Sequence, residues 1–328
     1  MIVCKFGGSC LTDKICLKNI KQIVKNNERK ILVFSAIGKT SFLNHKITDE
    51  LINSISNYEK TKELDLSNLA TALRNLCLQI KVKFNINKQI KKIKKCYLKT
   101  KNNNYLISRG EYLTCKIFSK YLKVKLISPK KVLFFTKKIK NSLKNNKNKK
   151  YLFKKNRKNL NKLIKKYRQI IIPGFYYYEN NQIQLFSRGG GDLTGAIISN
   201  FSSASVYENY NDVLGIFSVN PSIMKSKKLN HISYYDLKLI TENDGTIIHK
   251  DCVDWINEKT ELHVKSIYKP DLDATVVNDQ VSNESYICYS INGNYAKIVV
   301  NNSGVLNFKL IETKLLKKQI KKEYKNLG

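Results

Sequence analysis

Apolar residues recur along this chain in two alternating patterns, short continuous runs and stripes at helical spacing. The runs at 2–6 and 31–37 are bounded by glycine, as is typical of buried parallel strands. Between them lie apolar residues at the spacing of one helix face: Ile15, Leu17, Ile20, Ile23 and Val24. This order predicts a β-α-β unit with a right-handed crossover and a parallel strand pair.

The alternation continues through the rest of the chain. Helices are predicted over 110–122, 192–201 and 233–241, and strands over 124–128, 169–173, 204–207, 213–218 and 262–267, with a hairpin at 175–186 around Glu179-Asn180-Asn181. Because strands and helices alternate, the predicted fold class is α/β, with helices layered on a mostly parallel sheet.

Two segments have a different pattern. Residues 137–166 are dominated by Lys and Asn with a sparse apolar stripe, which favours a solvated helix over a partly mobile insert. The last fifty residues hold three strand-like runs, at 286–291, 296–300 and 305–311, and a Lys-rich terminal helix.

Composition indicates a folded chain of one large or two medium domains, since the 328 residues are 42% apolar and 26% charged. No stretch approaches the roughly 18 apolar residues of a membrane span, and Met1 leads directly into a predicted strand. We therefore expect a cytoplasmic protein with no membrane partner. Eight cysteines without a C-x-x-C pair are expected to be reduced and mostly buried.

The net charge of +35 raises the question of a polyanionic partner. The basic residues are 54 Lys and only six Arg, and there are 37 Asn. Proteins that read nucleic acid tend to use Arg, whose planar fork matches phosphates and base edges. Lys, Asn, Ile and Tyr have A/T-rich codons, so the composition favours drift in an A/T-rich, reduced genome such as an endosymbiont's, and it disfavours nucleic acid as a partner.

Three glycine-centred sites lie where a strand or loop meets a helix: 5–9 (Lys-Phe-Gly-Gly-Ser), 108–111 (Ser-Arg-Gly-Glu) and 187–194 (Ser-Arg-Gly-Gly-Gly-Asp-Leu-Thr). Glycine leaves the neighbouring backbone amides exposed, and exposed amides beside a cation can bind the oxygens of a phosphate or carboxylate. Each site alone is also compatible with a simple turn or capped helix. Gly38-Lys39-Thr40 mimics the end of a P-loop, but Val33 stands where that motif needs glycine.

These motifs, with Ser35-Ala36, Thr40 and residues 211–217 followed by Asn220-Pro221, together resemble the aspartokinases of the amino-acid kinase family over about residues 1–276. The resemblance implies a three-layer αβα fold with a mostly parallel central sheet and a short C-terminal α+β tail. It also implies an amino-acid-binding lobe at 1–200, a nucleotide-binding lobe at 201–277 and a tail at 278–328.

The implied activity is transfer of the ATP γ-phosphoryl group to the side-chain carboxylate of L-aspartate, giving 4-phospho-L-aspartate for lysine, threonine and methionine synthesis. Lys5 and Asp192 would be catalytic, and Mg²⁺ would be held mainly through the ATP phosphates rather than by a protein metal site. The resemblance assigns aspartate to Ser35, Thr40, Glu111, Arg188, Gly189 and Gly190, and ATP to Lys5, Gly7, Gly8, Ser9, Asn211, Asp212 and Phe217.

The chain departs from the family pattern at four positions. It has Asn220 in place of Asp, Ser222 in place of Arg, Phe217 in place of Tyr, and Thr246 in place of a phosphate-facing Lys. Loss of that lysine would remove a countercharge, for which Lys250 or Lys225 is a hypothetical substitute.

The 278–328 tail is too short for the pair of ACT regulatory modules that usually follows the kinase region. We therefore expect weak or absent inhibition by lysine or threonine, while the resemblance leaves a homodimer open. Two alternatives remain: a related kinase acting on another carboxylate such as glutamate, and a kinase-like fold that has become a catalytically decayed, basic nucleic-acid-binding protein.

Overall fold

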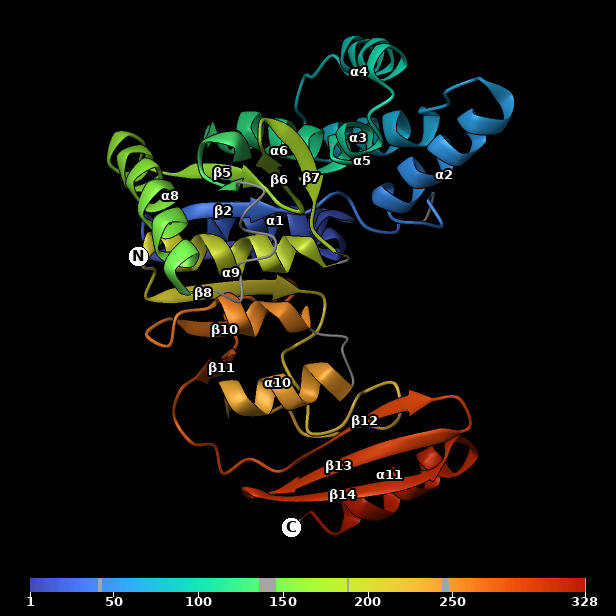
Figure 1. Ribbon diagram of the computed structural model, residues 1–328, viewed down its shortest axis with the longest axis vertical. Coiled ribbons are helices and arrows are strands. Elements are labelled where there is room, and N and C mark those ends of the chain that lie inside the picture. Colours follow the sequence, from blue (N-terminus) through green and yellow to red (C-terminus); the bar gives the residue numbers. More distant parts are fainter. Residues whose placement is uncertain (41–42, 136–145, 188, 244–247, 328) are drawn as a thin grey trace.

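The chain folds around one eight-stranded sheet, flanked by two smaller sheets of three strands (Figure 1). The computed structural model describes residues 1–40, 43–135, 146–187, 189–243 and 248–327, with the backbone alone at 146–153. The strand order of the large sheet is β3-β5-β2-β1-β8-β10-β11-β9. All its neighbouring strands run parallel except β10 and β11, which confirms the predicted α/β class.

The described elements follow one another with short connections over most of the chain. The strands are β1 (Ile2–Phe6), β2 (Arg29–Phe34), β3 (Lys125–Leu126), β4 (Phe134–Phe135), β5 (Ile170–Pro173), β6 (Tyr176–Glu179), β7 (Gln182–Leu185), β8 (Val206–Asn211), β9 (His231–Ser233), β10 (Glu261–Ser266), β11 (Thr275–Asn278), β12 (Tyr286–Asn292), β13 (Tyr295–Asn302) and β14 (Val305–Glu312). The helices are α1 (Lys14–Ile23), α2 (Ile47–Thr61), α3 (Ser67–Gln79), α4 (Ile86–Thr100), α5 (Asn103–Ile107), α6 (Arg109–Leu122), α8 (Asn146–Lys166), α9 (Gly190–Ser202), α10 (Tyr234–Asn243) and α11 (Leu316–Lys325), with 3₁₀ turns at Gly8–Leu11, Pro129–Lys131, Lys250–Trp255 and Thr313–Leu315.

Both faces of the strands β1, β2 and β5 are buried, which explains why these strands are largely continuous apolar runs, whereas β10 alternates buried and half-buried residues. Successive residues of a strand point to opposite faces, so Val3 packs with α8, α9 and α10, whereas Cys4 packs with α1 and the α2–α6 group. The helix layers above and below the sheet are visible in Figure 1. The result is the three-layer αβα arrangement that the sequence predicts.

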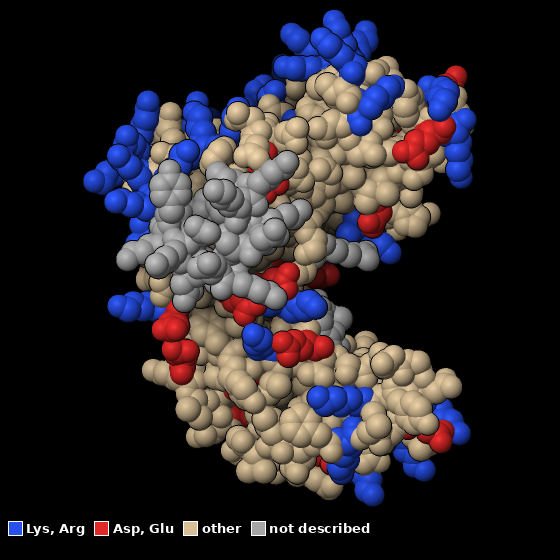
Figure 2. Space-filling model, viewed as in Figure 1, with Lys and Arg blue, Asp and Glu red and all other residues tan. Residues whose placement is uncertain are grey.

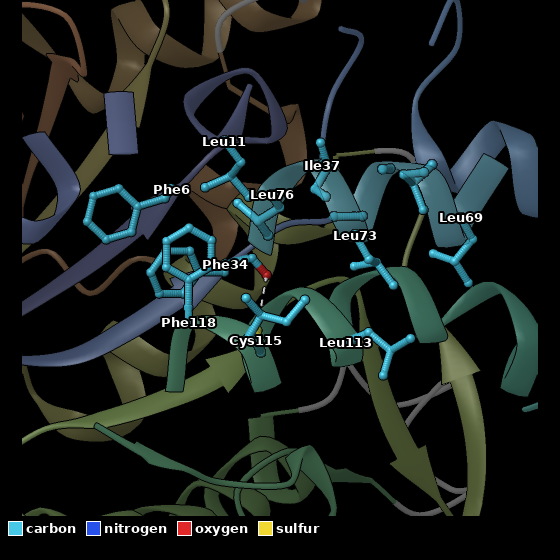
Figure 3. Packing of buried hydrophobic residues seen from close by; sticks show 14 of the residues in the cluster. Phe6, Leu11, Phe34, Ile37, Leu69, Leu73, Leu76, Leu113, Cys115 and Phe118 are labelled. Carbon is cyan, nitrogen blue, oxygen red and sulfur yellow. Dashed lines mark hydrogen bonds between the residues drawn. The ribbon is translucent and has the colours of Figure 1, made fainter. Parts of the chain in front are cut away.

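An aromatic stack fixes the central strands against α6 (Figure 3). The ring of Phe34 lies 4.9 Å from Phe6 and 4.4 Å from Phe118, and Phe6 stacks on Tyr210 at 5.2 Å. The Cys115 thiol donates to the Phe34 carbonyl at 3.9 Å. Each aromatic pair contributes about 0.5–1.5 kcal/mol beyond its burial, so the ends of β1, β2 and β8 are held in a fixed arrangement.

The C-terminal residues form a separate layer of β12, β13 and β14 in antiparallel order. One face of this sheet packs toward α10 through Tyr286, Cys288 and Val299. The opposite face is covered by α11, through Leu316 and Ile320. The three predicted strand-like runs and the terminal helix are confirmed.

Most other predicted elements are also present. The β1-α1-β2 unit is parallel, the hairpin turns at Asn180-Asn181, and 146–166 is helical, while the first part of the predicted 137–166 helix lies outside the described residues. The strand predicted at 204–207 begins at Val206 and extends to Asn211, and those predicted at 31–37 and 124–128 are shorter in the structure.

The predicted strand at 213–218 is wrong. These residues form an irregular loop with a single bridge between Phe217 and Lys228. Gly215 has φ +145°, and a Cβ there would lie 2.7 Å from the Thr275 hydroxyl. The run is apolar because Val213 and Phe217 line a cavity and Ile216 is buried in the cluster that includes Tyr286 and Cys288 of the tail, not because it enters a sheet.

All eight cysteines are free, and seven are buried, as expected for reduced thiols. Among the helices in the described part of the chain, none combines the length and the apolar character that a bilayer crossing requires.

Candidate active site

Lys5 lies at the centre of the candidate site, at the carboxyl end of β1. Its side chain is 6% exposed, and Nζ lies 2.5 Å from Asp192 Oδ1. Nζ also donates to the amide oxygens of Asn209 and Asn211, both at 3.2 Å. Asn209 in turn donates to the same Asp192 oxygen at 3.1 Å. A single ammonium is therefore held by one carboxylate and two amides where β1, β8 and α9 meet.

Glycines allow three separate segments to approach one another around this ammonium. The Gly38 amide donates to the Gly8 carbonyl at 2.9 Å, and a Cβ on Gly8 would lie 2.7 Å from the Ala36 carbonyl. A Cβ on Gly191 would lie 2.5 Å from Ser35 Oγ and 3.8 Å from Lys5 Cε. The turn after β1, the loop after β2 and the start of α9 thus meet at distances that side chains would prevent.

Glu111 lies in the first turn of α6, with its carboxyl group buried beside the loop after β2. Hydrogen bonds from the Ala36 backbone and the Thr48 side chain reach the carboxyl, but burial outweighs them and raises its pKa from 4.5 to about 8. The second oxygen, Oε2, is buried and has no partner among the described residues. The helix start therefore presents an acid that can accept a further hydrogen bond or pair with a cation.

The loop that follows β2 contributes two hydroxyls to the same region. Ser35 meets Gly191 as described above, and Thr40 Oγ1 is buried without a partner in the described chain. Gly189, the N-cap of α9 at φ +86°, lies against the ring of His249, whose Nε2 is 3.1 Å from Ser187 Oγ. Gly190 follows as the first residue of α9. The start of a 13-residue helix has free amides and a positive dipole end, which favour a bound anion.

A cavity of about 290 Å³ opens where β8 ends. The Asp212 carboxylate at its edge accepts a hydrogen bond from Ser9 Oγ at 3.1 Å, which joins the cavity to the turn after β1. Two residues of the C-terminal sheet, Tyr286 and Ile287, complete the wall. The lining residues are Asn211, Asp212, Val213, Gly215, Phe217, Asn220, Pro221, Ser222, Ile240, Tyr286 and Ile287.

One face of the molecule is hollowed between the part that carries α2 and the part that carries β12–β14 (Figure 2). On the same face, Lys and Arg gather densely over α4 and beside the described part of α8, and a few also lie at the edges of the hollow together with Asp and Glu.

The structure brings Lys5, Asp192, Glu111 and Asp212 together through the contacts above. Arg188 and Thr246 lie outside the described residues. Sequence reasoning missed Asn209, which joins Lys5 to Asp192, and the tail residues that line the cavity. Gly191 belongs to the predicted 187–194 motif, and the structure adds its contact with the loop after β2. The signal for Asn209 was its alternation with Asn211 in a strand that is otherwise buried.

In the described part of the chain, no group of three or more Cys, His, Asp or Glu side chains could hold a metal ion. Mg²⁺ dehydrates reluctantly and often binds through substrate phosphates with one or two protein carboxylates. Asp192, which is paired with Lys5, and Asp212, which accepts a hydrogen bond from Ser9, are the carboxylates near the turn after β1 that would contribute to such a site.

Comparisons with known proteins agree with this geometry. The model of the amino acid kinase family matches residues 1–266. The chain is 27% identical over 297 residues to aspartokinase 3 of Bacillus subtilis, covering 84% of this chain and 63% of the relative. It is 24% identical over 298 residues to the aspartokinase of Rickettsia prowazekii, covering 85% and 55%. The chain therefore spans less than two thirds of these curated relatives.

Solved structures show the same fold. The aspartate kinase of Clostridium acetobutylicum superposes with a TM-score of 0.73 at 27% identity, covering 88% of this chain and 66% of that protein. Aspartokinase III of E. coli, solved in complex with aspartate and ADP, gives a TM-score of 0.69 at 18% identity, covering 88% and 67%. The second likeness, at this identity, concerns the fold alone.

Proposed function

Since its first 266 residues match the family model, this chain belongs to the amino acid kinase family, and we propose that it is an aspartate kinase. It would transfer the γ-phosphoryl group of ATP to the side-chain carboxylate of L-aspartate. One observation carries the proposal: β1, whose Lys5 pairs with Asp192, lies in the sheet between β2, whose following loop contacts the buried Glu111, and β8, at whose end the cavity opens. The similarity to aspartokinases over more than four fifths of the chain supports this choice of substrate.

The nucleotide would bind in the cavity at the end of β8. Phe217 offers an apolar surface there, and Asn211 and Asp212 offer polar atoms to the sugar. The glycine turn of Gly7 and Gly8, followed by Ser9, leads from this cavity to Lys5. We propose that its backbone amides and the Lys5 ammonium hold the phosphates, because a cation beside exposed amides stabilises their negative charge.

Aspartate would bind on the other side of Lys5. The Glu111 carboxylate would pair with the α-ammonium group of the substrate, which would give Oε2 a partner that none of the described residues supplies. We assign the substrate carboxylates to the start of α9, with Gly189, Gly190 and Arg188, and to the hydroxyls of Ser35 and Thr40. An Arg fork grips a carboxylate through two parallel hydrogen bonds, which adds specificity to affinity.

Phosphoryl transfer to a carboxylate needs alignment and charge neutralisation rather than a general base, because the acceptor is already an anion at neutral pH. Lys5 would neutralise charge on the transferring group, and Asp192 would fix the position of the ammonium and organise neighbouring cations. Mg²⁺, when bound with ATP, supplies countercharge to the phosphates. Departures at Asn220 and Ser222 fall on the wall of the cavity, so they would affect nucleotide affinity before transfer.

Several finer assignments follow from the resemblance and belong to the same proposal. We divide the chain into an amino-acid lobe at 1–200, a nucleotide lobe at 201–277 and a tail at 278–328, and place it in the cytoplasm on the route to lysine, threonine and methionine in an organism with a reduced genome. Feedback inhibition by lysine or threonine would be weak or absent. Exposed apolar residues on β14, Val305, Phe308 and Leu310, are consistent with a homodimer.

The test is ADP production by the purified chain with Mg-ATP across a panel of amino acids, with Lys5→Ala and Arg188→Ala as controls. We expect ADP formation with aspartate and its loss in both variants. Turnover with glutamate in place of aspartate would favour the related kinase. Absence of ADP formation with every amino acid, together with RNA retention that falls steeply with salt, would favour the nucleic-acid alternative.

A further inference from the structure

The wall of the nucleotide cavity is shared between the kinase fold and the C-terminal tail. Strand β12 contributes Tyr286 and Ile287 to the lining, together with the loop that carries Phe217. The backbone amide of Ile287 donates to the carbonyl of Ser218 at 2.7 Å. The tail is therefore hydrogen-bonded to the residue that follows Phe217, in the loop that shapes the cavity.

A buried carboxylate fastens the tail sheet to the kinase fold. Asp236, 6% exposed in the first turn of α10, accepts a hydrogen bond from the Tyr286 hydroxyl at 2.8 Å and from the Asn301 amide at 3.2 Å, both on Oδ1. Its Oδ2 is occupied by the hydroxyl and amide of Ser233. Both tail donors are almost fully buried. Hydrogen bonds to a charged acceptor in such surroundings are among the stronger polar contacts of a protein.

The other face of the tail sheet holds the same cavity loop. Val219 is buried in one apolar cluster with Ile287 and Ile298 of the sheet and Leu316 of α11, and Met224 packs against that cluster. The segment from Phe217 to Met224 therefore lies between the kinase fold and the tail. A shift of β12 would move the wall of the cavity, because the loop is bonded and packed to that strand.

We propose that the β12–β14 sheet is a constituent wall of the nucleotide pocket, with Ile287 contacting the base or ribose and Tyr286 acting as a positioning residue through Asp236. This inference rests on the proposed function, since the ligand is the nucleotide of that reaction. It makes the tail a determinant of nucleotide affinity. Aspartate would bind on the other side of Lys5, against Glu111, so changes in the tail should leave its affinity unchanged.

The test compares Tyr286→Phe, which removes one hydroxyl, with Tyr295→Phe, a control on the same sheet whose side chain is 57% exposed. Nucleotide binding is measured by calorimetry with Mg-ADP alone, and KM values for ATP and aspartate are measured separately. We expect Tyr286→Phe to weaken ADP binding and raise KM for ATP by at most about tenfold, because the lost bond to Asp236 loosens β12 and only part of its energy acts on the cavity wall. KM for aspartate and kcat should stay near wild type, as should every value of the control.

A second variant, Ile287→Ala, enlarges the cavity and leaves the hydrogen bonds to Asp236 in place. It is used if Tyr286→Phe does not fold. It should likewise weaken ADP binding and leave KM for aspartate unchanged. Folded variants that bind ADP with wild-type affinity, or variants that change both KM values and kcat equally, would overturn the inference. A wild-type chain that binds ADP but does not phosphorylate aspartate would refute the proposed function. The calorimetric comparison of ADP binding would then still test the role of the tail. A wild-type chain that binds no nucleotide would overturn both.

Discussion

Glu111→Gln tests the aspartate half of the site while preserving the size of the side chain. In the free protein the carboxyl is buried, its Oε2 has no partner among the described residues, and its pKa is raised to about 8. Glutamine keeps the shape and one carbonyl acceptor but removes the charge that would pair with the substrate ammonium. If Glu111 binds that ammonium, the variant loses affinity for aspartate and keeps its affinity for ATP.

The size of the effect can be worked from the contact that is lost. A hydrogen bond to a charged group contributes about 1.5–3 kcal/mol, which corresponds to a fall in kcat/KM for aspartate of roughly 10- to 150-fold. KM for ATP should change less than about twofold, because the nucleotide cavity lies on the other side of Lys5.

The raised pKa also gives the wild-type enzyme a distinctive pH profile. With a pKa of about 8, the Glu111 carboxyl is ionised in about 1% of free molecules at pH 6 and in about half at pH 8. Only the ionised form pairs with the ammonium, so KM for aspartate should fall at least about tenfold over this range. The Gln variant has no group to ionise there, and its profile should be flat.

Stability gives an independent readout with a defined sign. Since the folded-state pKa lies above the ordinary value of 4.5, the folded chain holds this proton more tightly, and the free energy of unfolding falls as pH rises from about 4.5 to about 8. Between pH 5.5 and 8.5 the wild-type chain should lose roughly 3 kcal/mol relative to the Gln variant. Urea unfolding at the two pH values measures the difference.

Glu50→Gln is the matched control, because Glu50 also lies in the first turn of a helix but is only partly buried and is hydrogen-bonded by Asn68 at 2.6 Å. It should leave KM for aspartate and the pH profile unchanged. A Glu111→Gln enzyme with wild-type KM for aspartate and a wild-type pH profile would refute the assignment of this residue to the substrate ammonium.

Three further outcomes test other parts of the site. Lys5→Ala should lower kcat by about 10³-fold, since it removes a buried countercharge and takes away the cationic partner of Asp192. Activity within tenfold of wild type in a folded variant would contradict the role of Lys5. Gly8→Ala should destabilise the chain by about 1–3 kcal/mol and raise KM for ATP, because the new Cβ would lie 2.7 Å from the Ala36 carbonyl; thermal unfolding and ATP titration measure both effects. EDTA should abolish ADP formation and Mg²⁺ should restore it, with the far-UV spectrum unchanged; full activity without a divalent cation would exclude the proposed donor complex.

Local patterns predicted much of the fold, because buried parallel strands and amphipathic helices have periodicities that a short window reveals. The strand at 2–6 and the helix at 110–122 match the structure closely. The region of α2–α5 received no prediction. At 213–218 the apolar run was interpreted as a strand, although Gly215 and the cavity decide its conformation. An apolar run indicates that its residues are buried, but it does not indicate whether they form a strand, a helix or a loop.

The site itself depends on contacts that no local pattern contains. Lys5 and Asp192 are 187 residues apart in the chain, and their ion pair exists because β1 lies beside β8 and beneath α9. Glycine positions were the best sequence signal, since Gly8 and Gly191 occupy points where a side chain would collide with a neighbouring segment. The partners at those points, Ala36 and Ser35, could be named only by resemblance to a family.

The high net charge of the chain and the arrangement of charges in the site have different physical causes. The chain has 35 more basic than acidic residues, and Figure 2 shows dense groups of Lys and Arg over outer helices such as α4. Lys5, by contrast, is buried and ion-paired, so its position is fixed by Asp192 and two amides and is little affected by bulk salt. Exposed lysines can accumulate without changing a buried ion pair. A composition shaped by codon usage is therefore compatible with a site shaped by its chemistry.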